Sequence, residues 1–454
     1  MPIEYDQEIV AEVVEDEPLP VDVTDRVLAP IITIDGRIHG PTSDFLRTYC
    51  FARPNLASAR RLASDLRGWL DYLCNDCGLI PFEDGRDPTL VATEDHFARY
   101  YRMRQYGSPE QVLTSEGWAR AASAIKRYYE YTRNRYQHAP PFDIVSFNFR
   151  GMGSGTMIAK YQPRRRSTGS AGVPITPEFA DLLLMGALRV DRDGHQANYR
   201  AADRDHAIIS LGLGAGLRRN NLANVTTYEI PKPSGLRFTT MRIADRITKN
   251  DAGGDALVFT HRLPAVYGYL DGARADIVAS KRFEPPRPLQ MVSADATGVQ
   301  FVSEELPDEV ISRRWTEMDE GQRRRLVDVD GSSPILFLNE YTGAPLAYST
   351  YQHAVDDAGR FVRERINPDF PDRFRLHDLR HTYAVHLAVA IYRGQIAEAV
   401  GEVRQSDWTV DHIAAAVELV KYSLGHASEA STRLYIQAAH RFLEIPAAEF
   451  VGGA

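Results

Sequence analysis

Hydrophobic residues recur at helical spacing through the first part of the chain. In residues 57–74 and again in residues 117–136, apolar side chains fall three or four positions apart, which places them on one face of an α-helix. The predicted buried faces consist of Leu62, Leu66, Trp69, Leu70 and Leu73 in the first stretch and of Trp118, Ala122, Ile125 and Tyr129 in the second. The pattern predicts a small helical domain over residues 41–150.

Helical patterns resume after a linker and surround one strand-rich interval. Thr176 before Pro177 and Glu178 is a typical helix start, with a capping hydroxyl, a proline at the first helical position and an acid in the first turn. Two strand-like stretches then flank "NDAGGD", which predicts a β-hairpin within residues 236–263. Residues 278–333 look irregular and heavily charged, and we expect them to form a surface insertion. The predicted fold class is mainly α with a small β-hairpin or sheet (α+β).

The composition is that of a soluble globular protein, with 44% hydrophobic and 25% charged residues. No apolar run approaches the roughly 20 residues that cross a bilayer. The first residues lack the basic start and apolar block of a secretory signal. Three cysteines are too few for a disulfide framework, and the single C-x-x-C has no second pair to complete a zinc site. We therefore expect a cytoplasmic protein without a membrane span or a metal.

Charge is distributed unevenly along the chain. Residues 1–40 hold ten Asp and Glu against two arginines, a net charge of −8 that equals that of the whole chain. This acidic, Pro-containing stretch is expected to be a partly disordered extension. Residues 41–170 hold 19 Lys and Arg against 13 Asp and Glu. A basic module in a neutral body is compatible with DNA binding, although a basic face is more often simply solvated.

Six basic residues are candidates for contacts to DNA. Three lie on the polar side of the second helix, and three form a run in a linker over residues 151–172 that is rich in Pro, Gly and Ser. The candidates are Lys126, Arg127 and Arg133 in the helix and Arg164, Arg165 and Arg166 in the linker. A basic linker can cross a phosphate backbone, and the alternative is a solvated tether between domains.

The glycines of "LGLGAGLRRNNLANV", residues 211–225, raise the question of a nucleotide-binding loop. Their spacing is G-x-G-x-G rather than G-x-G-x-x-G, and the preceding residues favour a helix rather than a strand, so the dinucleotide motif fails. The glycines are instead expected to permit a tight turn between helices. That turn would deliver Arg218 or Arg219 into a site.

A second segment, "FRLHDLRHTYAVHL", carries a histidine and an arginine at helical spacing. His377 and Arg380 are three positions apart, so they lie near each other on a helix, away from its apolar stripe. His381 and His386 in the same segment are expected to be surface or packing residues. A His and Arg pair at this spacing is common, so the segment alone is weak evidence for a site.

In a third segment, "LGHASEASTRLYIQ", Tyr435 stands nine positions after His426, and Lys249 lies at the edge of the predicted hairpin turn. A helical tyrosine is more often a packing residue, so its role depends on the groups that reach its hydroxyl. The guanidiniums of Arg218 and Arg380 can hold the non-bridging oxygens of a phosphodiester. A histidine can take the phenol proton, and a lysine can protonate the departing oxygen. Phenolate attack conserves the phosphodiester energy in a covalent ester, so no ATP, metal or other cofactor is expected.

These three segments resemble the boxes of the tyrosine recombinase (phage integrase) family. "GLRRNNLANV" is similar to the first arginine box, "HDLRHTYAVHL" to the His-x-x-Arg box, and "LGHASEASTRLYI" to the Leu-Gly-His and Tyr box with the expected spacing. The resemblance covers residues 173–437, and the helical domain resembles the core-binding domain of the family. It implies a phosphate clamp of Arg218 and Arg380, a general acid at Lys249, proton transfer assisted by His377, a phosphate donor at His426 and a nucleophile at Tyr435.

The resemblance implies a site-specific DNA recombinase or integrase. Tyr435 would form a 3′-phosphotyrosyl link to double-stranded DNA and release a 5′-hydroxyl. Four copies on two duplexes would form a homotetramer during synapsis and exchange strands through a Holliday junction. Accessory DNA-bending proteins would be further partners, and the protein would associate with the nucleoid when bound to DNA.

Two alternatives stay open. A type IB topoisomerase uses nearly the same groups, but acts as a monomer and rejoins the same strand. The Leu-Gly-His box and the small helical domain before it favour the recombinase. A catalytically silent DNA-binding accessory protein would bind DNA without cleaving it, and the intact set of six residues argues against that reading.

The sequence departs from the family pattern in its supports and its length. An acid usually follows the first arginine by three positions, but Asn221 stands there, so a carboxylate from elsewhere, such as Asp378, would have to support Arg218. Insertions are expected near residues 278–333 and 390–415 of a catalytic domain that spans residues 173–454. These departures concern substrate and regulation more than the chemistry.

Overall fold

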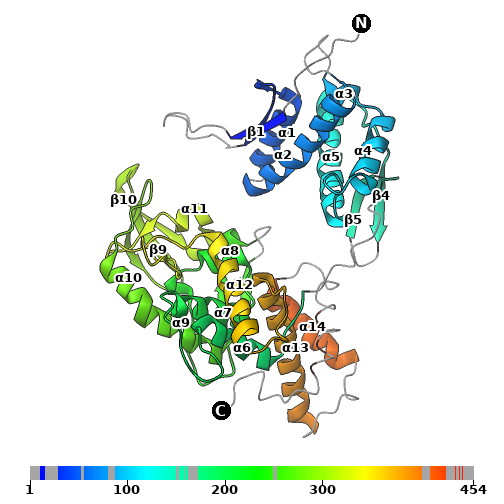
Figure 1. Ribbon diagram of the computed structural model, residues 1–454. Helices are drawn as coiled ribbons and strands as arrows, with labels where there is room; N and C mark the ends of the chain where they lie inside the picture. The colour runs from blue at the N-terminus through cyan, green and yellow to red at the C-terminus, as the bar shows by residue number, and fades with distance from the viewer. Residues whose placement is uncertain are drawn as a thin grey trace. The chain divides into compact units, whose positions relative to one another are not determined.

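The computed structural model describes most of the chain, which divides into an N-terminal unit, Met1–Ser170, and a C-terminal unit, Ala171–Ala454 (Figure 1). The described elements are mainly α-helices with small sheets, which confirms the predicted fold class. Described are residues 11–15, 29–52, 56–79, 87–149, 153–158, 160–161, 172–248, 253–400 and 410–425, together with Tyr435, Ala439 and Phe442.

The N-terminal unit is a group of helices with two small sheets. Its helices are α1 (Gly40–Ala52), α2 (Leu56–Asp71), α3 (Pro88–Val91), α4 (Glu94–Tyr106) and α5 (Ser115–Tyr136), and a π-helical turn over Tyr72–Asp76 extends α2. Its strands are β1 (Ala11–Glu15), β2 (Pro30–Ile34) and β3 (Arg37–Ile38) in one sheet and β4 (Ile144–Phe149) and β5 (Gly153–Ile158) in the other.

The core of this unit follows the helical periodicity of the sequence. The predicted face of α2 is buried against α5, and Trp69 donates a hydrogen bond from its indole N–H to the hydroxyl of Tyr129 at 3.2 Å. Strand β2 also contributes to this core, because Ile32 and Ile34 alternate inward and are fully buried. Residues 30–34 and 37–38, which were expected to belong to the acidic, Pro-containing extension, therefore form strands of the N-terminal unit.

The C-terminal unit contains the remaining described helices and strands. Its helices are α6 (Pro177–Leu188), α7 (Ala202–Ala215), α8 (Arg219–Asn224), α9 (Leu263–Tyr269), α10 (Ala275–Ser280), α11 (Glu320–Arg323), α12 (Tyr348–Arg365), α13 (Leu376–Val400) and α14 (Val410–Leu424). Its strands are β6 (Phe238–Ile243), β7 (Gly254–Phe259), β8 (Leu289–Ala294), β9 (Gly298–Ser303), β10 (Leu306–Arg314) and β11 (Leu326–Val327). In the described part of the chain, no helix is long and apolar enough to cross a membrane.

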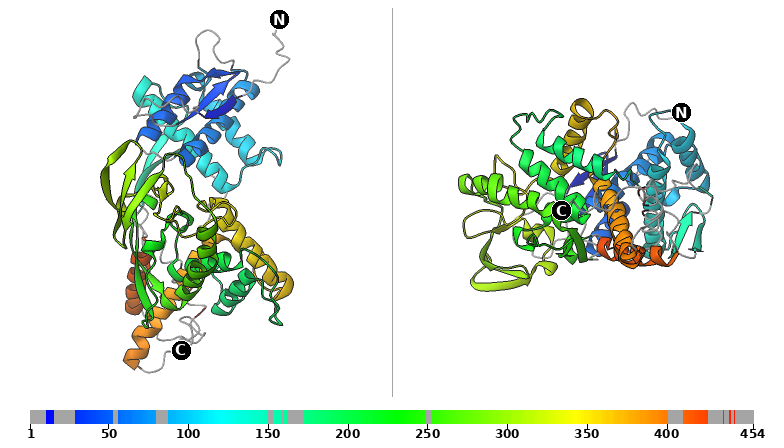
Figure 2. Two further views of the ribbon diagram at one scale, coloured as in Figure 1. Left: turned by 90° about the vertical axis from the view of Figure 1, so that its left-hand side faces the viewer. Right: turned by 90° about the horizontal axis from the view of Figure 1, so that it is seen from below.

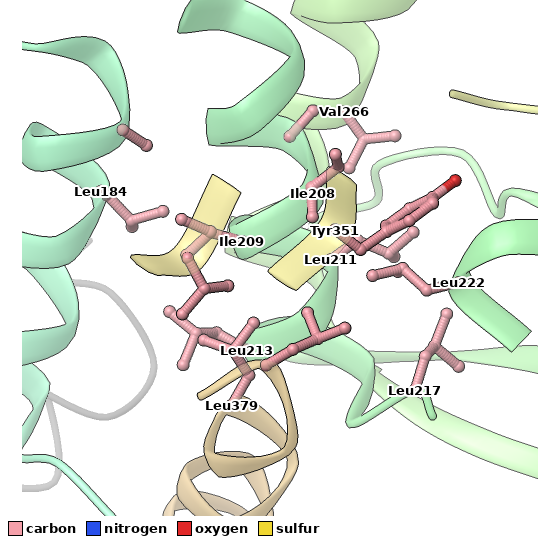
Figure 3. Packing of buried hydrophobic residues seen from close by; sticks show 14 of the residues in the cluster. Leu184, Ile208, Ile209, Leu211, Leu213, Leu217, Leu222, Val266, Tyr351 and Leu379 are labelled. Atoms are coloured by element: carbon pink, nitrogen blue, oxygen red, sulfur yellow. The ribbon is translucent and has the colours of Figure 1, made fainter. Parts of the chain in front are cut away.

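Helix α7 lies at the centre of the C-terminal unit. Nearly all of its side chains are buried, and α6, α9, α12 and α13 pack around it. Figure 3 shows Ile208, Ile209, Leu211 and Leu213 of α7 among the apolar side chains of its neighbours. Because this helix is buried on nearly every side, it is the element against which the other helices of the unit are placed.

Two glycines at the end of α7 have different structural roles. A Cβ at Gly212 would come within 2.7 Å of the Leu379 side chain of α13, so this glycine allows the two helices to approach closely. Gly216 ends α7 with a φ of +60°, a left-handed conformation that favours glycine, and it packs against the Tyr383 ring. The expected tight turn is present, and it leads directly into Arg218.

Three elements far apart in sequence meet beside α7. Strands β6 and β7 pair antiparallel, which confirms the predicted hairpin, and α14 packs along α13 and against β7 (Figure 2). Polar groups join them: Ser423 of α14 accepts from the Leu257 N–H of β7 at 2.9 Å and shares a hydrogen bond with the Tyr383 hydroxyl of α13 at 2.6 Å. These contacts hold the segments that carry the predicted site residues.

The expectation that residues 278–333 are irregular was wrong. They contain a four-stranded sheet in the order β10-β9-β8-β11, with a hydrophobic core of its own. Within β8, Leu289 and Met291 point into this core while Gln290 is exposed, the alternation of a half-buried strand. The charged residues between short strands obscured that alternation in the sequence. In the second expected insertion, residues 390–400 continue α13 and residues 410–415 begin α14.

Candidate active site

Helix α13 is oriented by its apolar stripe, which in turn places its polar residues. Leu376, Leu379, Tyr383 and Leu387 are all buried, as the helical periodicity predicts. The helix begins with a local cap, in which the Asp378 carboxylate accepts from the backbone N–H of Arg375 at 2.8 Å. With the stripe fixed against α7, Arg380 is directed toward the junction of α7, α13 and α14.

The guanidinium of Arg380 joins the three segments. The side chain is 5% exposed. Its Nη1 donates to the Gly216 carbonyl at 2.6 Å, and its Nη2 donates to the Leu424 carbonyl at 2.5 Å. Gly216 lies two positions before Arg218, and Leu424 lies two positions before His426. One buried side chain therefore contacts the chain next to each of the other two motifs.

Arg218 and Arg380 form a pair of like charges. Arg218 occupies the N-cap position of α8 and is half-buried. Burial lowers the pKa of Arg218, and burial together with the positive charge of Arg218 lowers the pKa of Arg380 to about 9. Among the described residues, no Asp or Glu offsets the charge of either guanidinium. Two cations held together in this way form a site that favours an anion.

The carboxylate proposed to support Arg218 has another partner. Asp378 caps the start of α13, and in the described part of the chain no ion pair joins it to Arg218. Asn221, at the position where the resemblance implies an acid, is buried and donates from its side-chain amide to the Ile247 carbonyl at 3.1 Å. This amide ties α8 to the chain just before the hairpin turn and leaves the charge of the arginines unopposed.

Tyr435 lies beside the arginine pair. It is 7% exposed and packs in a hydrophobic cluster with side chains of α13 and α14, including Ala388 and Leu424. Burial raises the pKa of the phenol, while the positive charges of Arg380 and Arg218 act to lower it. The hydroxyl therefore lies within the electrostatic field of both guanidiniums, where a phenolate would be stabilised.

His377 lies at the surface end of the same face of α13. Desolvation of its ring and the charge of Arg380 lower its pKa. At pH 7 the imidazole is therefore neutral and can accept a proton through one ring nitrogen. The site thus combines two guanidiniums, a phenol and a neutral imidazole.

His381 belongs to this site although the sequence indicated only a surface or packing residue. Its buried ring lies 4.6 Å from the ring of His377 and 5.2 Å from that of Tyr435, measured between centroids. Burial, with smaller contributions from the charges of His377 and Arg380, lowers its pKa to about 4. The four-residue spacing from His377 could have identified that contact, but no local pattern places Tyr435 next to it. His386 is also buried and hydrogen-bonds the Ile175 carbonyl at 2.9 Å.

Several predicted site residues lie outside the described residues. They are Lys249, His426, Arg164, Arg165 and Arg166. In the N-terminal unit, Arg127 and Arg133 are exposed on α5. The side chain of Lys126 is 13% exposed, and its ammonium lies 3.4 Å from the Glu130 carboxylate. Of these three, the two arginines are the better placed for contacts to a ligand.

One group of side chains in the described residues has the spacing of metal ligands. Asp191, Asp193 and His195 lie on the loop after α6, and their potential ligand atoms are within 4.8 Å of one another. The Asp191 carboxylate already accepts from the backbone N–H groups of Asp193 and His195, at 3.0 and 2.9 Å. This arrangement is a local turn, and none of the predicted site residues belongs to it.

No model of a protein family matches the chain, and no curated protein matches it. Solved structures do. The XerH site-specific recombinase bound to a palindromic difH substrate, in a post-cleavage complex, is 13% identical over 90% of this chain and 84% of that chain, with a TM-score of 0.47. The Tn1549 transposon integrase in complex with transposon right end DNA is 12% identical over 89% of this chain and 98% of that chain, with a TM-score of 0.44. A lambda integrase dimer bound to a COC′ core site is 10% identical over 86% of this chain and 94% of that chain, with a TM-score of 0.42.

Proposed function

We propose that this protein cuts and rejoins DNA strands as a site-specific recombinase, with Tyr435 as the nucleophile. The observation that carries the proposal is a pair of arginines, without an acidic partner among the described residues, beside a buried tyrosine. A packing tyrosine needs no charge near its hydroxyl. A tyrosine that attacks a phosphodiester needs both a clamp for the phosphate and stabilisation of its own phenolate.

The arginine pair is suited to a phosphodiester because several of its N–H donors have no hydrogen-bond partner among the described residues. A guanidinium has five N–H donors, and two of those of Arg380 are used by backbone carbonyls. The others, with those of Arg218, can fork across two non-bridging oxygens. A phosphate bound there relieves the repulsion between the two cations and the cost of their burial.

The proposed chemistry uses these groups together with two that the sequence motifs suggest. The Tyr435 oxygen attacks phosphorus as its proton passes toward neutral His377, and the bond to the 5′-oxygen breaks. Arg218 and Arg380 offset the charge that grows on the non-bridging oxygens. Lys249 protonates the departing 5′-oxygen and His426 donates to a phosphate oxygen, roles that the sequence motifs suggest. The product is a 3′-phosphotyrosyl ester and a free 5′-hydroxyl, and attack by a 5′-hydroxyl reverses the step.

In a recombinase, that hydroxyl comes from a partner strand. We propose a homotetramer on two duplexes that exchanges strands through a Holliday junction, assisted by DNA-bending proteins where the DNA must be curved. The exposed arginines of α5 and the linker run Arg164 to Arg166 would contact phosphates.

A selection for covalent complexes tests the proposal without knowledge of the target sequence. Purified protein is mixed with nicked duplexes that carry a randomised segment, so that cleavage releases a short 5′-hydroxyl fragment and traps the enzyme. Wild type should accumulate protein joined to a DNA 3′ end, with EDTA present and ATP absent. The trapped duplexes are then sequenced to find a shared target.

Two tyrosine variants complete the test. Tyr435→Phe should fold and bind DNA but trap none, because only one oxygen is removed from a ring that still packs. Tyr422→Phe is the matched control: Tyr422 is 59% exposed and donates its hydroxyl to Asp255 at 3.2 Å, away from the arginine pair, and should trap DNA normally. Trapping by Tyr435→Phe would falsify the proposal, and so would loss of wild-type trapping in EDTA. Trapped duplexes without any shared sequence, together with plasmid relaxation, would favour a type IB topoisomerase instead.

A further inference from the structure

Helix α8, which follows Arg218, is too short to be stable without contacts to the rest of the fold. Helix α8 has six residues, and a helix this short is not stable alone in water. Arg218 stands at its N-cap position without a side-chain capping bond. The position of the Arg218 guanidinium therefore depends on the contacts that hold α8 in the C-terminal unit.

The N-terminal half of α8 is tied to the chain before the hairpin turn. The side-chain amides of Asn220 and Asn221 both donate to the Ile247 carbonyl, at 2.9 and 3.1 Å. Asn224, at the other end of the helix, donates from its own amide to the Asn220 carbonyl at 2.9 Å. These bonds fix the N-terminal half of α8, and Leu222 and Ala223 pack in the core of the C-terminal unit.

The C-terminal end of α8 is held by two arginines of the insertion over residues 278–333, at the end of α11. Arg323 donates from Nη1 to the Asn224 carbonyl at 2.9 Å, and Arg324 donates from Nη2 to the Ala223 carbonyl at 3.1 Å. Arg324 also donates from Nε to the Asn224 side-chain oxygen at 2.9 Å. Carbonyls at the end of a helix have no partner within it, so these guanidiniums satisfy groups that would otherwise lack a hydrogen bond.

Arg324 is itself fixed on its far side. Its Nη2 donates to the Leu346 carbonyl at 3.1 Å, and its guanidinium lies over the Tyr348 ring, 4.7 Å from the centroid. The Tyr348 hydroxyl accepts from the Asn224 amide at 2.7 Å and donates to the Glu320 carboxylate at 3.0 Å. Arg324, Asn224 and Tyr348 thus form a closed network that joins the insertion, α8 and the start of α12.

We propose that the insertion over residues 278–333 is a positioning element of the active site, and that Arg324 is the residue through which it places Arg218. Arg324 does not reach the reacting atoms. It holds the end of a short helix whose other end presents a phosphate ligand. This inference rests on the proposed function, because it takes Arg218 as part of the phosphate clamp.

The variant that tests this is Arg324→Met, which keeps an unbranched aliphatic side chain and removes the N–H donors. Arg323 is unsuitable, because its removal would leave the buried Glu229 carboxylate without its partner. The matched control is Arg325→Met: Arg325 is the next residue in the run, and its Nε donates to the Arg287 carbonyl within the insertion. Both variants are made in the full-length chain, and thermal unfolding checks that each is folded.

Cleavage of a duplex recovered in the selection separates positioning from binding. We expect Arg324→Met to slow single-turnover cleavage at saturating DNA by about 10- to 100-fold, because a displaced ligand costs rate more than affinity. DNA affinity should stay at the wild-type value, and Arg325→Met should match wild type in both measurements. Equal cleavage by the wild type and Arg324→Met overturns the inference.

A double variant shows whether Arg324 acts through Arg218. In an Arg218→Lys background, adding Arg324→Met should cause little further loss, because the residue being positioned is already impaired. The same loss in both backgrounds overturns the inference, since a general loss of structure would be additive. If the wild type cleaves no duplex, the proposed function fails. Orthovanadate is then the probe: weaker thermal stabilisation of Arg324→Met than of Arg325→Met supports positioning of an oxyanion site, and equal stabilisation overturns it.

Discussion

Two buried arginines in the C-terminal unit lie in opposite electrostatic surroundings. Arg323, at the base of the inserted sheet, is fully buried and uses all of its N–H directions. It donates to the carbonyls of Met318, Asn224 and Trp315 and forms a two-bond ion pair with Glu229 at 2.6 and 3.1 Å. Its charge is neutralised within the fold, so it has nothing left to offer a ligand.

Arg380 is nearly as buried, but its charge is not neutralised. The only hydrogen bonds of its guanidinium among the described residues go to two backbone carbonyls, and the charge that most affects its pKa is that of another arginine. The comparison teaches that burial of an arginine does not identify a site. What identifies it is a buried charge whose partner is absent from the described residues, because such a group is costly unless a ligand completes it.

The largest expected effect comes from removal of the ion pair between Arg323 and Glu229. Arg323→Met should lower the free energy of unfolding by about 3–5 kcal/mol, because it leaves a buried carboxylate unpaired. Urea denaturation measures this loss. Adding Glu229→Met to the same chain should restore much of the stability, since both charges are then gone. A loss below about 1 kcal/mol in the single variant would mean that water reaches Glu229.

The second prediction concerns substitution of Arg380, whose charge is unopposed among the described residues. Arg380→Lys should lose cleavage by about 10²- to 10³-fold, because an ammonium cannot fork across two phosphate oxygens. Its loss of stability should be smaller than that of Arg323→Met, since no buried carboxylate is left behind. Arg360→Lys on the exposed face of α12 is the control and should cleave normally. Near-normal cleavage by Arg380→Lys would contradict a bidentate contact between Arg380 and the phosphate.

The third prediction concerns pH and extends the comparison to two buried histidines of α13, His381 and His386. Burial lowers the pKa of His381 to about 4 and that of His386 to about 3, below the ordinary value of 6.5. Below pH 6.5 the unfolded chain therefore binds protons that the folded chain does not. Stability should be constant above that pH and should fall as pH drops toward 4, by at most about 1.4 kcal/mol per pH unit for each ring.

Thermal unfolding between pH 8 and pH 4 measures this slope. His386→Phe should flatten it, because a ring that cannot be protonated contributes nothing to the difference between the folded and unfolded states. His195→Phe, at an exposed position, serves as the control and should leave it unchanged. An identical slope in His386→Phe would assign the acid sensitivity to other groups.

The smallest effect concerns two runs of three arginines. Arg323 to Arg325 is a structural run, whereas the linker run Arg164 to Arg166 is proposed to contact DNA. Neutralising the linker run should weaken binding to all sequences alike and reduce the slope of log affinity against log salt by about 0.9 for each lost phosphate contact. Filter binding across a salt series measures it, and an unchanged slope would make the linker a solvated tether.

The sequence predicted well those features that depend on neighbouring residues. The buried stripe of α13, the cap at Thr176 and the β6–β7 hairpin all follow from periodicity or turn chemistry within a few positions. The helical spacing also brought His377 and Arg380 together correctly on α13.

What the sequence did not predict depends on long-range contacts. The strands of the insertion are short and interrupted by charges, and the burial of Arg323 requires Glu229, 94 positions earlier. His381 contacts Tyr435 because Tyr435 packs in a cluster with side chains of α13 and α14, which no local pattern encodes. The sequence of a run of arginines therefore does not show whether the run is structural or binds a ligand. That distinction requires the partners of each guanidinium.

The two carbonyls that hold Arg380 have a consequence for the energetics of recognition. A free arginine side chain carries about 2 kcal/mol of rotamer entropy, which is lost when a ligand immobilises it. In this fold, Gly216 and Leu424 have already fixed the guanidinium. That entropy is lost once, during folding, and not again at each encounter with a phosphate. The site is preorganised, and this advantage depends on backbone atoms that no side-chain substitution can remove.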